Sequence, residues 1–228
     1  MDQTTPDLAA KALRVHQLLL EHFGSPRWEN PMPPLDELVS TILSQNTNDA
    51  NRDRAYQSLR WRFPTWEQVR DAPVEQVVAA IRPAGLANQK GPRIQGVLRE
   101  ITAQHSSLDL GFLSELRPEE VNAWLRSFKG VGPKTAAIVL LFSLGKPAFP
   151  VDTHIYRVSG RIGLRPEKMN AEQAHAHLAK LLPPESYYAA HLNLIRLGRE
   201  ICQARRPNCP VCPLKDLCDY YAGLSSSG

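Results

Sequence analysis

Two residues of this chain, Lys134 and Asp152, have side chains and a spacing that could carry out covalent chemistry. Lys134 follows Gly132 by two residues, and Asp152 lies eighteen residues further on, in the segment Val151-Asp152-Thr153-His154. Only a neutral lysine amine is a nucleophile, and an unperturbed lysine, with a pKa of ~10.4, is protonated at neutral pH. We therefore expect burial or an acceptor to favour the neutral amine of Lys134, with Asp152 as the candidate acceptor.

Both residues also have an ordinary explanation. Lys134 could be a solvated surface lysine near a phosphate. An aspartate just ahead of a helix is usually an N-cap, a role that contributes about 1 kcal/mol. Spacing alone leaves the catalytic and the ordinary interpretations open for Lys134 and for Asp152.

The segment before Lys134 predicts two helices joined by a tight turn. Apolar spacing predicts a helix over residues 119–127, and Pro133 suits the first position of a second helix, expected over residues 135–144 and apolar nearly all round. The turn between them contains two glycines, which adopt backbone angles closed to other residues. Backbone N–H groups at such a helix start have no partner and lie at the positive end of the helix dipole, so the turn predicts an anion site. Its residues are Gly130, Val131 and Gly132.

Four cysteines lie together near the C-terminus: Cys202, Cys209, Cys212 and Cys218. Their confinement to one short stretch of a chain expected to be intracellular favours a metal over disulfides. Four thiolates can hold a tetrahedral zinc ion or an iron–sulfur cluster, and the spacing alone leaves both open.

Two further segments look like loops with unusual side chains. Residues 44–49 are polar and contain Gln45 and Asn46; a solvated loop that caps the following helix is the ordinary explanation. Residues 83–91 form an expected loop with one exposed-looking leucine, Leu86. A single leucine in a loop usually packs on its own domain.

This part of the chain resembles the helix-hairpin-helix DNA glycosylases whose motif ends in a Gly/Pro segment and an aspartate. The resemblance lies in the glycine hairpin, the lysine two residues past its second glycine and the Val-Asp-Thr-His segment. The cysteine spacing is similar to that of one branch, the endonuclease III family. The resemblance runs from about residue 30 to residue 220. It implies that Lys134 is the nucleophile, that Asp152 is the second catalytic group, and that the cysteines hold a structural 4Fe-4S cluster.

The resemblance also implies a set of DNA contacts. Asn46 or Gln45 would fill the gap left by an extruded nucleotide, and Leu86 would wedge into the opened duplex. Arg205 and Arg206, between the first two cysteines, would contact a phosphate unless they are merely solvated. The expected DNA-binding residues are Gly130, Val131, Gly132, Gln45, Asn46, Leu86, His154, Arg205 and Arg206.

Composition and pattern set the fold class. The chain has 228 residues, 43% hydrophobic and 22% charged, with a net charge of +4, which permits a polyanionic partner. No segment alternates with period two, while helical spacing recurs, for example over residues 7–23 and 154–162. Thr65 with Gln68 and Asn170 with Gln173 predict capping boxes. The expected fold is all-α.

The expected organisation is two helical domains. Residues 30–145 would form a bundle with the helix-hairpin-helix, and residues 1–29 with 146–228 an iron–sulfur cluster domain, with the site in the cleft between them. The N-terminus lacks an export signal and no apolar run reaches membrane length. We expect a monomer without membrane association, cytoplasmic and nucleoid-associated, in a bacterium or archaeon.

The function implied is a bifunctional DNA glycosylase/AP lyase of base excision repair. It would remove oxidised pyrimidines from double-stranded DNA through a Schiff base and cleave 3′ to the abasic site by β-elimination. Two alternatives remain. A monofunctional mismatch or uracil glycosylase would not need Lys134, and a non-catalytic helix-hairpin-helix DNA-binding module would leave Asp152 and the cysteines unexplained.

Overall fold

Every regular element of the described chain is helical. The computed structural model describes residues 4–225, and no strand occurs in that range. The predicted all-α class is therefore confirmed. None of the helices within residues 4–225 is long and apolar enough to cross a membrane.

The chain divides into two compact units, residues 30–145 and residues 1–29 with 146–228. These bounds coincide with those of the two predicted domains, of which residues 1–3 and 226–228 lie outside the described range. The assignment of these units as two domains stays a prediction.

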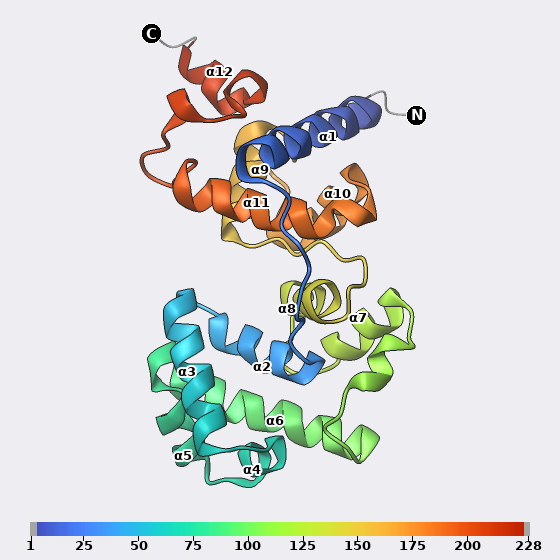
Figure 1. Ribbon diagram of the computed structural model, residues 1–228, viewed down its shortest axis with the longest axis vertical. Coiled ribbons are helices and arrows are strands. Elements are labelled where there is room, and N and C mark those ends of the chain that lie inside the picture. Colours follow the sequence, from blue (N-terminus) through green and yellow to red (C-terminus); the bar gives the residue numbers. More distant parts are fainter. Residues whose placement is uncertain (1–3, 226–228) are drawn as a thin grey trace. The chain divides into compact units, whose positions relative to one another are not determined.

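The unit of residues 30–145 is built around α2 (Figure 1). Its helices are α2 (Pro34–Ser44), α3 (Asp49–Arg62), α4 (Trp66–Asp71), α5 (Val74–Ala80), α6 (Ala87–His105), α7 (Pro118–Arg126) and α8 (Pro133–Ile138). The α2 helix contacts α3, α6 and α8, and Leu38, Ile42 and Leu43 of α2 are fully buried. The short 3₁₀ helices η1 (Arg82–Ala84) and η2 (Gly111–Ser114) precede α6 and α7.

Polar contacts hold α3 and α4 to α2. Asp36 of α2 accepts hydrogen bonds from the Tyr56 hydroxyl of α3 and, at 3.2 Å, from Trp66 Nε1 of α4. The α4 helix begins with the predicted capping box, because Thr65 accepts from the Gln68 N–H and the Gln68 side chain accepts from the Thr65 N–H. This prediction is confirmed.

A loop was predicted over residues 83–91, and the prediction is wrong for residues 87–91, because α6 already begins at Ala87. Leu86 is the residue before the helix, with φ 50° and ψ 30°, and its carbonyl accepts from the backbone N–H groups of Gln89 and Lys90. Asn, Gly and Pro residues favoured a loop in the sequence, but Pro92 lies inside the helix, as its sixth residue.

The buried helix after the glycine turn changes its winding half-way. The sequence predicted one helix over residues 135–144, whereas α8 ends at Ile138 and a π-helical turn, η3 (Val139–Ser143), follows. The N–H of Leu144 bonds to the carbonyl of Val139 at 3.2 Å, the five-residue spacing of a π-helix. Val139 and Leu140 are buried, so the expected buried position is confirmed.

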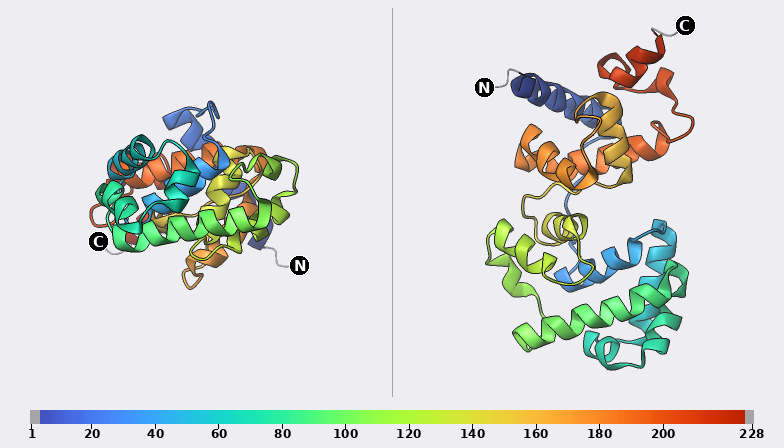
Figure 2. Two further views of the ribbon diagram at one scale, coloured as in Figure 1. Left: turned by 90° about the horizontal axis from the view of Figure 1, so that it is seen from below. Right: turned by 180° about the vertical axis from the view of Figure 1, so that it is seen from behind.

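The other unit joins the first helix to the last third of the chain (Figure 2). Its helices are α1 (Thr4–Phe23), α9 (Thr153–Ile162), α10 (Ala171–Leu181), α11 (Tyr187–Glu200) and α12 (Asp219–Ser225), with 3₁₀ helices η4 (Pro184–Ser186), η5 (Cys209–Val211) and η6 (Lys215–Leu217). The α1 helix contacts α10 and α11, and α9 contacts α11 and α12. The capping box predicted for Asn170 and Gln173 is confirmed at the start of α10.

Candidate functional site

The hairpin between α7 and α8 has the geometry that its glycines predict. Gly130 has φ 86°, a left-handed conformation that favours glycine, and Gly132 precedes α8 as its N-cap. Val131 is 5% exposed, and its N–H bonds to the carbonyl of Phe128 at 3.1 Å. The buried valine fixes the turn while the first N–H groups of α8 lack intrahelical acceptors, which is the arrangement expected of an anion site.

Lys134 lies in the first turn of α8 and its side chain is exposed. Burial was one of the two sources expected to favour its neutral amine, and the unit of residues 30–145 does not supply it. An acceptor is therefore the remaining source. The role of Lys134 as nucleophile stays a prediction.

Asp152 is half-buried and caps α9. Its Oδ1 accepts a hydrogen bond from the Ile155 N–H at 2.7 Å. The capping interpretation is thus confirmed, and the catalytic one stays a prediction. His154, two residues later, contacts Arg157 through Nδ1 at 3.2 Å and packs beside Gly198 of α11.

The polar loop after α2 presents its two amides differently. Gln45 is half-buried, and its Oε1 accepts a hydrogen bond from Arg93 of α6 at 2.7 Å. Asn46 is exposed and has φ 54°. Asn48 caps α3 by accepting from the Asn51 N–H at 2.9 Å, so the capping role predicted for this loop is confirmed.

Leu86 projects from the turn before α6, with 47% of its surface exposed. The ordinary interpretation, in which the leucine packs on its own domain, therefore holds for only about half of the Leu86 surface. A large apolar side chain held in a left-handed turn at the start of a long helix suits a wedge, and this role stays a prediction.

A functional candidate that sequence reasoning missed is Lys90. Its side chain is 1% exposed, and Nζ donates to the carbonyls of Leu43 and Ala84 at 2.7 and 2.8 Å. Burial, and then the nearby charge of Arg93, lower the pKa of Lys90. The sequence did contain a signal for the burial of Lys90. The apolar side of this helix includes Ile94 and Ile101, and the position four residues before Ile94 on the same side is Lys90.

The four cysteines line one pocket in the unit of residues 1–29 with 146–228. None forms a disulfide, and all four are half-buried. Burial, and then the neighbouring thiols of Cys202 and Cys218, raise the pKa of Cys209; burial also raises the pKa of Cys212. No cluster of three or more ligating side chains within residues 4–225 is already arranged to hold a metal ion. The pocket thus gathers four thiols of the right kind for a metal centre.

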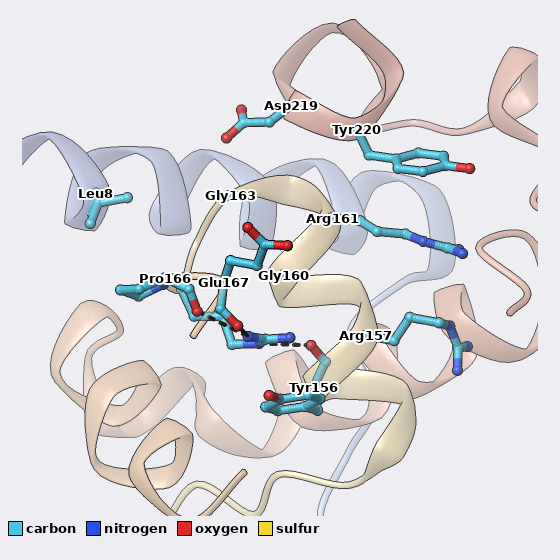
Figure 3. Close-up of a pocket in the computed structure, with 11 residues that line it drawn as sticks. Leu8, Tyr156, Arg157, Gly160, Arg161, Gly163, Pro166, Glu167, Asp219 and Tyr220 are labelled. Carbon is cyan, nitrogen blue, oxygen red and sulfur yellow. Dashed lines mark hydrogen bonds between the residues drawn. The ribbon is translucent and has the colours of Figure 1, made fainter. Parts of the chain in front are cut away.

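A second missed residue, Arg161 of α9, organises the loop between the first two cysteines. It donates to the carbonyls of Gln203 and Ala204 at 2.7 and 2.8 Å, and to Cys202 Sγ at 3.4 Å. Its guanidinium carbon lies 4.8 Å from the centre of the Tyr220 ring (Figure 3). The loop that Arg161 fixes carries the exposed side chains of Arg205 and Arg206, as a phosphate contact would require.

The groove beside Arg161 does not offer free cations. Arg157 donates to the carbonyls of Cys202 and Gly198 at 3.1 and 2.8 Å, and Arg165 donates to the carbonyl of Tyr156 at 2.9 Å. These arginines line a groove between α9 and α12 (Figure 3), but their guanidinium groups already bond to backbone carbonyls. Arg157, like Arg161, joins the cysteine loop to α9, whereas Arg165 bonds back to Tyr156 of α9 itself.

Comparison with known proteins gives a consistent assignment. Residues 39–184 match the family described as HhH-GPD superfamily base excision DNA repair protein. The chain is 34% identical over 212 residues to endonuclease III of Escherichia coli (strain K12), covering 92% of this chain and 96% of that protein. A solved structure of a trapped endonuclease III–DNA covalent intermediate matches with a TM-score of 0.82 and 26% identity, covering 95% of this chain and 98% of that one. The all-α helix-hairpin-helix fold is thereby confirmed.

Two plant relatives are much longer than this chain. An Arabidopsis thaliana protein named as a DNA glycosylase is 37% identical over 174 residues, which cover 76% of this chain and 59% of that protein. The DNA glycosylase/AP lyase ROS1 of Arabidopsis thaliana is 31% identical over 179 residues, covering 71% of this chain and 13% of ROS1. The chain thus spans only 59% and 13% of these two relatives.

Proposed function

This chain belongs to the endonuclease III family within the HhH-GPD superfamily of base excision DNA repair proteins, and on that premise we propose that it is a bifunctional DNA glycosylase/AP lyase. Its partner is DNA, and its substrates are double-stranded DNA with oxidised pyrimidines or abasic sites. The observation that carries the proposal is Lys134, an exposed amine in the first helical turn after the Gly130–Gly132 hairpin.

The reaction begins with an extruded nucleotide, because the target sugar carbon cannot be reached inside a duplex. Backbone N–H groups of the hairpin hold a phosphate, which brings the adjacent sugar to Lys134. The neutral amine attacks C1′, the bond from C1′ to the base breaks, and the base leaves with the bonding electrons.

The sugar ring then opens, and the amine nitrogen and C1′ form an imine. Water takes a proton from C2′, the electrons of that C–H bond form a double bond between C2′ and C3′, and the bond between C3′ and its oxygen breaks, so that the 3′ phosphate leaves by β-elimination. Asp152 accepts the proton of Lys134 and offsets positive charge on the sugar. One of its oxygens, Oδ1, already caps α9, which leaves Oδ2 for this role.

The four cysteines fit a bound 4Fe-4S cluster, since four thiols line one pocket and none is in a disulfide. Cys202, Cys209, Cys212 and Cys218 would hold it. With four protein ligands no iron would be left open, so a bound cluster would stabilise the loop that carries Arg205 and Arg206. Those arginines then contact a DNA phosphate.

The remaining contacts concern the opened duplex. Leu86 enters between bases, an amide of the Gln45–Asn46 pair fills the gap, and His154 lies near the DNA backbone. The protein acts as a monomer in the cytoplasm, on nucleoid DNA.

Borohydride trapping tests the proposed function. If Lys134 forms an imine, reduction on an abasic duplex gives a stable protein–DNA adduct that maps to Lys134. Lys134→Gln abolishes trapping and strand cleavage but retains binding to an abasic-site analogue, because the hairpin N–H groups remain. Lys129→Gln, an exposed lysine of the same hairpin, retains trapping and serves as the matched control.

The outcomes separate the alternatives. A monofunctional glycosylase releases the base without an adduct, and a non-catalytic module binds the duplex without releasing a base. An adduct that survives Lys134→Gln would remove Lys134 as the nucleophile.

A further inference from the structure

The first two turns of α6 contact three segments that the proposed function places at the DNA. These segments are the polar loop after α2, the turn that carries Leu86, and the glycine hairpin. Two cations of α6, Lys90 and Arg93, make the contacts, and all of them lie within the unit of residues 30–145.

Lys90 joins the first two segments. Its ammonium donates to the carbonyl of Leu43, next to the last residue of α2, and to the carbonyl of Ala84, two residues before Leu86. The end of a helix has carbonyls without intrahelical donors and carries the negative end of the dipole, so a buried ammonium is well placed there. One buried side chain therefore sets the spacing between the polar loop and the Leu86 turn.

Arg93 joins the polar loop to the hairpin. One guanidinium nitrogen donates to Gln45 Oε1 at 2.7 Å. The same side chain crosses Gly130 so closely that a Cβ built on that glycine would lie 2.5 Å from Arg93 Nε. Gly130 therefore has two reasons to be glycine, its φ of 86° and the arginine that covers it.

The contact with Arg93 distinguishes the two amides of the loop. Gln45 is half-buried, and its side-chain oxygen Oε1 accepts the hydrogen bond from Arg93. Its neighbour Asn46 is exposed, in a left-handed conformation that asparagine tolerates. A side chain that must enter a gap in DNA binds better if the backbone beneath it is already ordered.

We propose that Arg93 is a positioning residue that holds Gln45 against the hairpin, so that Asn46 is the amide that enters the gap left by the extruded nucleotide. The inference rests on the proposed function and goes beyond it, since it assigns separate roles to Gln45 and Asn46. Lys90, whose side chain is buried, holds the same polar loop next to the Leu86 turn.

The test compares Arg93→Ala, Gln45→Ala and the double variant on two substrates. Single-turnover base release is measured on a duplex with one oxidised pyrimidine, and strand cleavage on a duplex with a preformed abasic site. Each single variant should slow base release by about tenfold, within the range that coupled contacting residues reach. The double variant should lose no more than either single variant, because both changes remove one contact.

Cleavage at the preformed abasic site should change by less than about twofold, because much less of the unpairing cost remains there. Asn46→Ala should slow base release more than Gln45→Ala does. Arg99→Ala, on the same helix but bonded to the Arg70 carbonyl at 3.1 Å, is the matched control and should leave both rates unchanged.

Additive losses in the double variant, or equal losses on both substrates, would overturn the inference. A larger loss from Gln45→Ala than from Asn46→Ala would also overturn it, by making Gln45 the entering amide. If Arg93→Ala does not fold, base release by Gln45→Ala and by Asn46→Ala still decides which amide enters the gap. Unmodified protein that forms no trapped adduct contradicts the proposed function itself, and the two failures are thereby distinguished.

Discussion

The carboxylate of Asp152 accepts a hydrogen bond from the backbone N–H of Ile155 at 2.7 Å, so the carboxylate proposed to accept a proton in catalysis is also the N-cap of α9. A cap needs one side-chain oxygen, whereas proton transfer and charge stabilisation need a carboxylate. Stability and turnover therefore depend on different properties of one side chain, and a substitution can separate them.

Asp152→Asn should keep the cap and lose the chemistry. Asparagine caps helices about as well as aspartate, so the free energy of unfolding should change by well under ~1 kcal/mol. Base release should fall by orders of magnitude because the carboxylate is gone. Urea unfolding and single-turnover kinetics measure the two effects, with Asp152→Ala as the variant that loses both. A folded Asp152→Asn protein with near-normal turnover would leave only the capping role.

Leu86→Ala should impair entry into an intact duplex more than later steps. The variant should release bases from a lesion duplex more slowly, while cleavage at a preformed abasic site changes little. Leu13→Ala is a matched control, because Leu13 on α1 is also a leucine with 47% exposure. Equal losses on both substrates would instead indicate that Leu86 packs against its own unit.

The cysteine pocket predicts the colour and metal content of the protein. Protein prepared without oxygen should be yellow-brown and contain about four irons per chain, as a 4Fe-4S cluster requires. Cys212→Ser should lower the iron content, measured by elemental analysis and by absorbance. Stoichiometric zinc without iron would identify the other metal that four cysteines can hold.

His16 predicts a loss of stability in acid. Burial lowers the pKa of His16 below its ordinary value of 6.5, and its Nδ1 is buried without a hydrogen-bond partner in the described chain. The unfolded chain therefore binds a proton at His16 more readily than the folded chain does. The contribution of His16 to the free energy of unfolding is complete above pH 6.5 and is lost as pH falls towards the lowered pKa.

The slope from this one group is at most about 1.4 kcal/mol per pH unit. Urea unfolding between neutral and acidic pH should show a smaller loss in His16→Gln than in the unmodified protein. His22→Gln, which changes an exposed histidine of the same helix, should leave the curve unaltered. Parallel curves for all three proteins would show that His16 makes no contribution.

Local signals allowed part of the fold to be predicted. The capping boxes at Thr65 and Asn170 depend only on residues three positions apart, and Gly130 adopts the left-handed turn that glycine favours. The start of α6 was missed because its stabilising contact is distant, since Lys90 bonds to Leu43, 47 residues earlier. The pairing of Arg93 with Gln45 spans 48 residues and has no sequence signal.

The candidate site was less accessible to physical reasoning than the fold. The residue types at Lys134 and Asp152 permit nucleophilic chemistry, but only the resemblance to a family favoured catalysis over the ordinary roles. The winding change at Val139 could not be predicted, because a π-helical turn has the same apolar pattern as the α-helix around it.

The partners of α1 set the order in which the chain can fold during synthesis. The α1 helix contacts α10 and α11, which begin at Ala171 and Tyr187, whereas the helices that α2 contacts most, α3 and α8, lie within residues 30–145. A ribosome therefore synthesises every helix of the unit of residues 30–145 before it has made the surfaces that cover α1. The nascent chain must carry the apolar side of α1, including Val15 and Leu19, uncovered through most of translation, and this interval is where chaperone binding should concentrate.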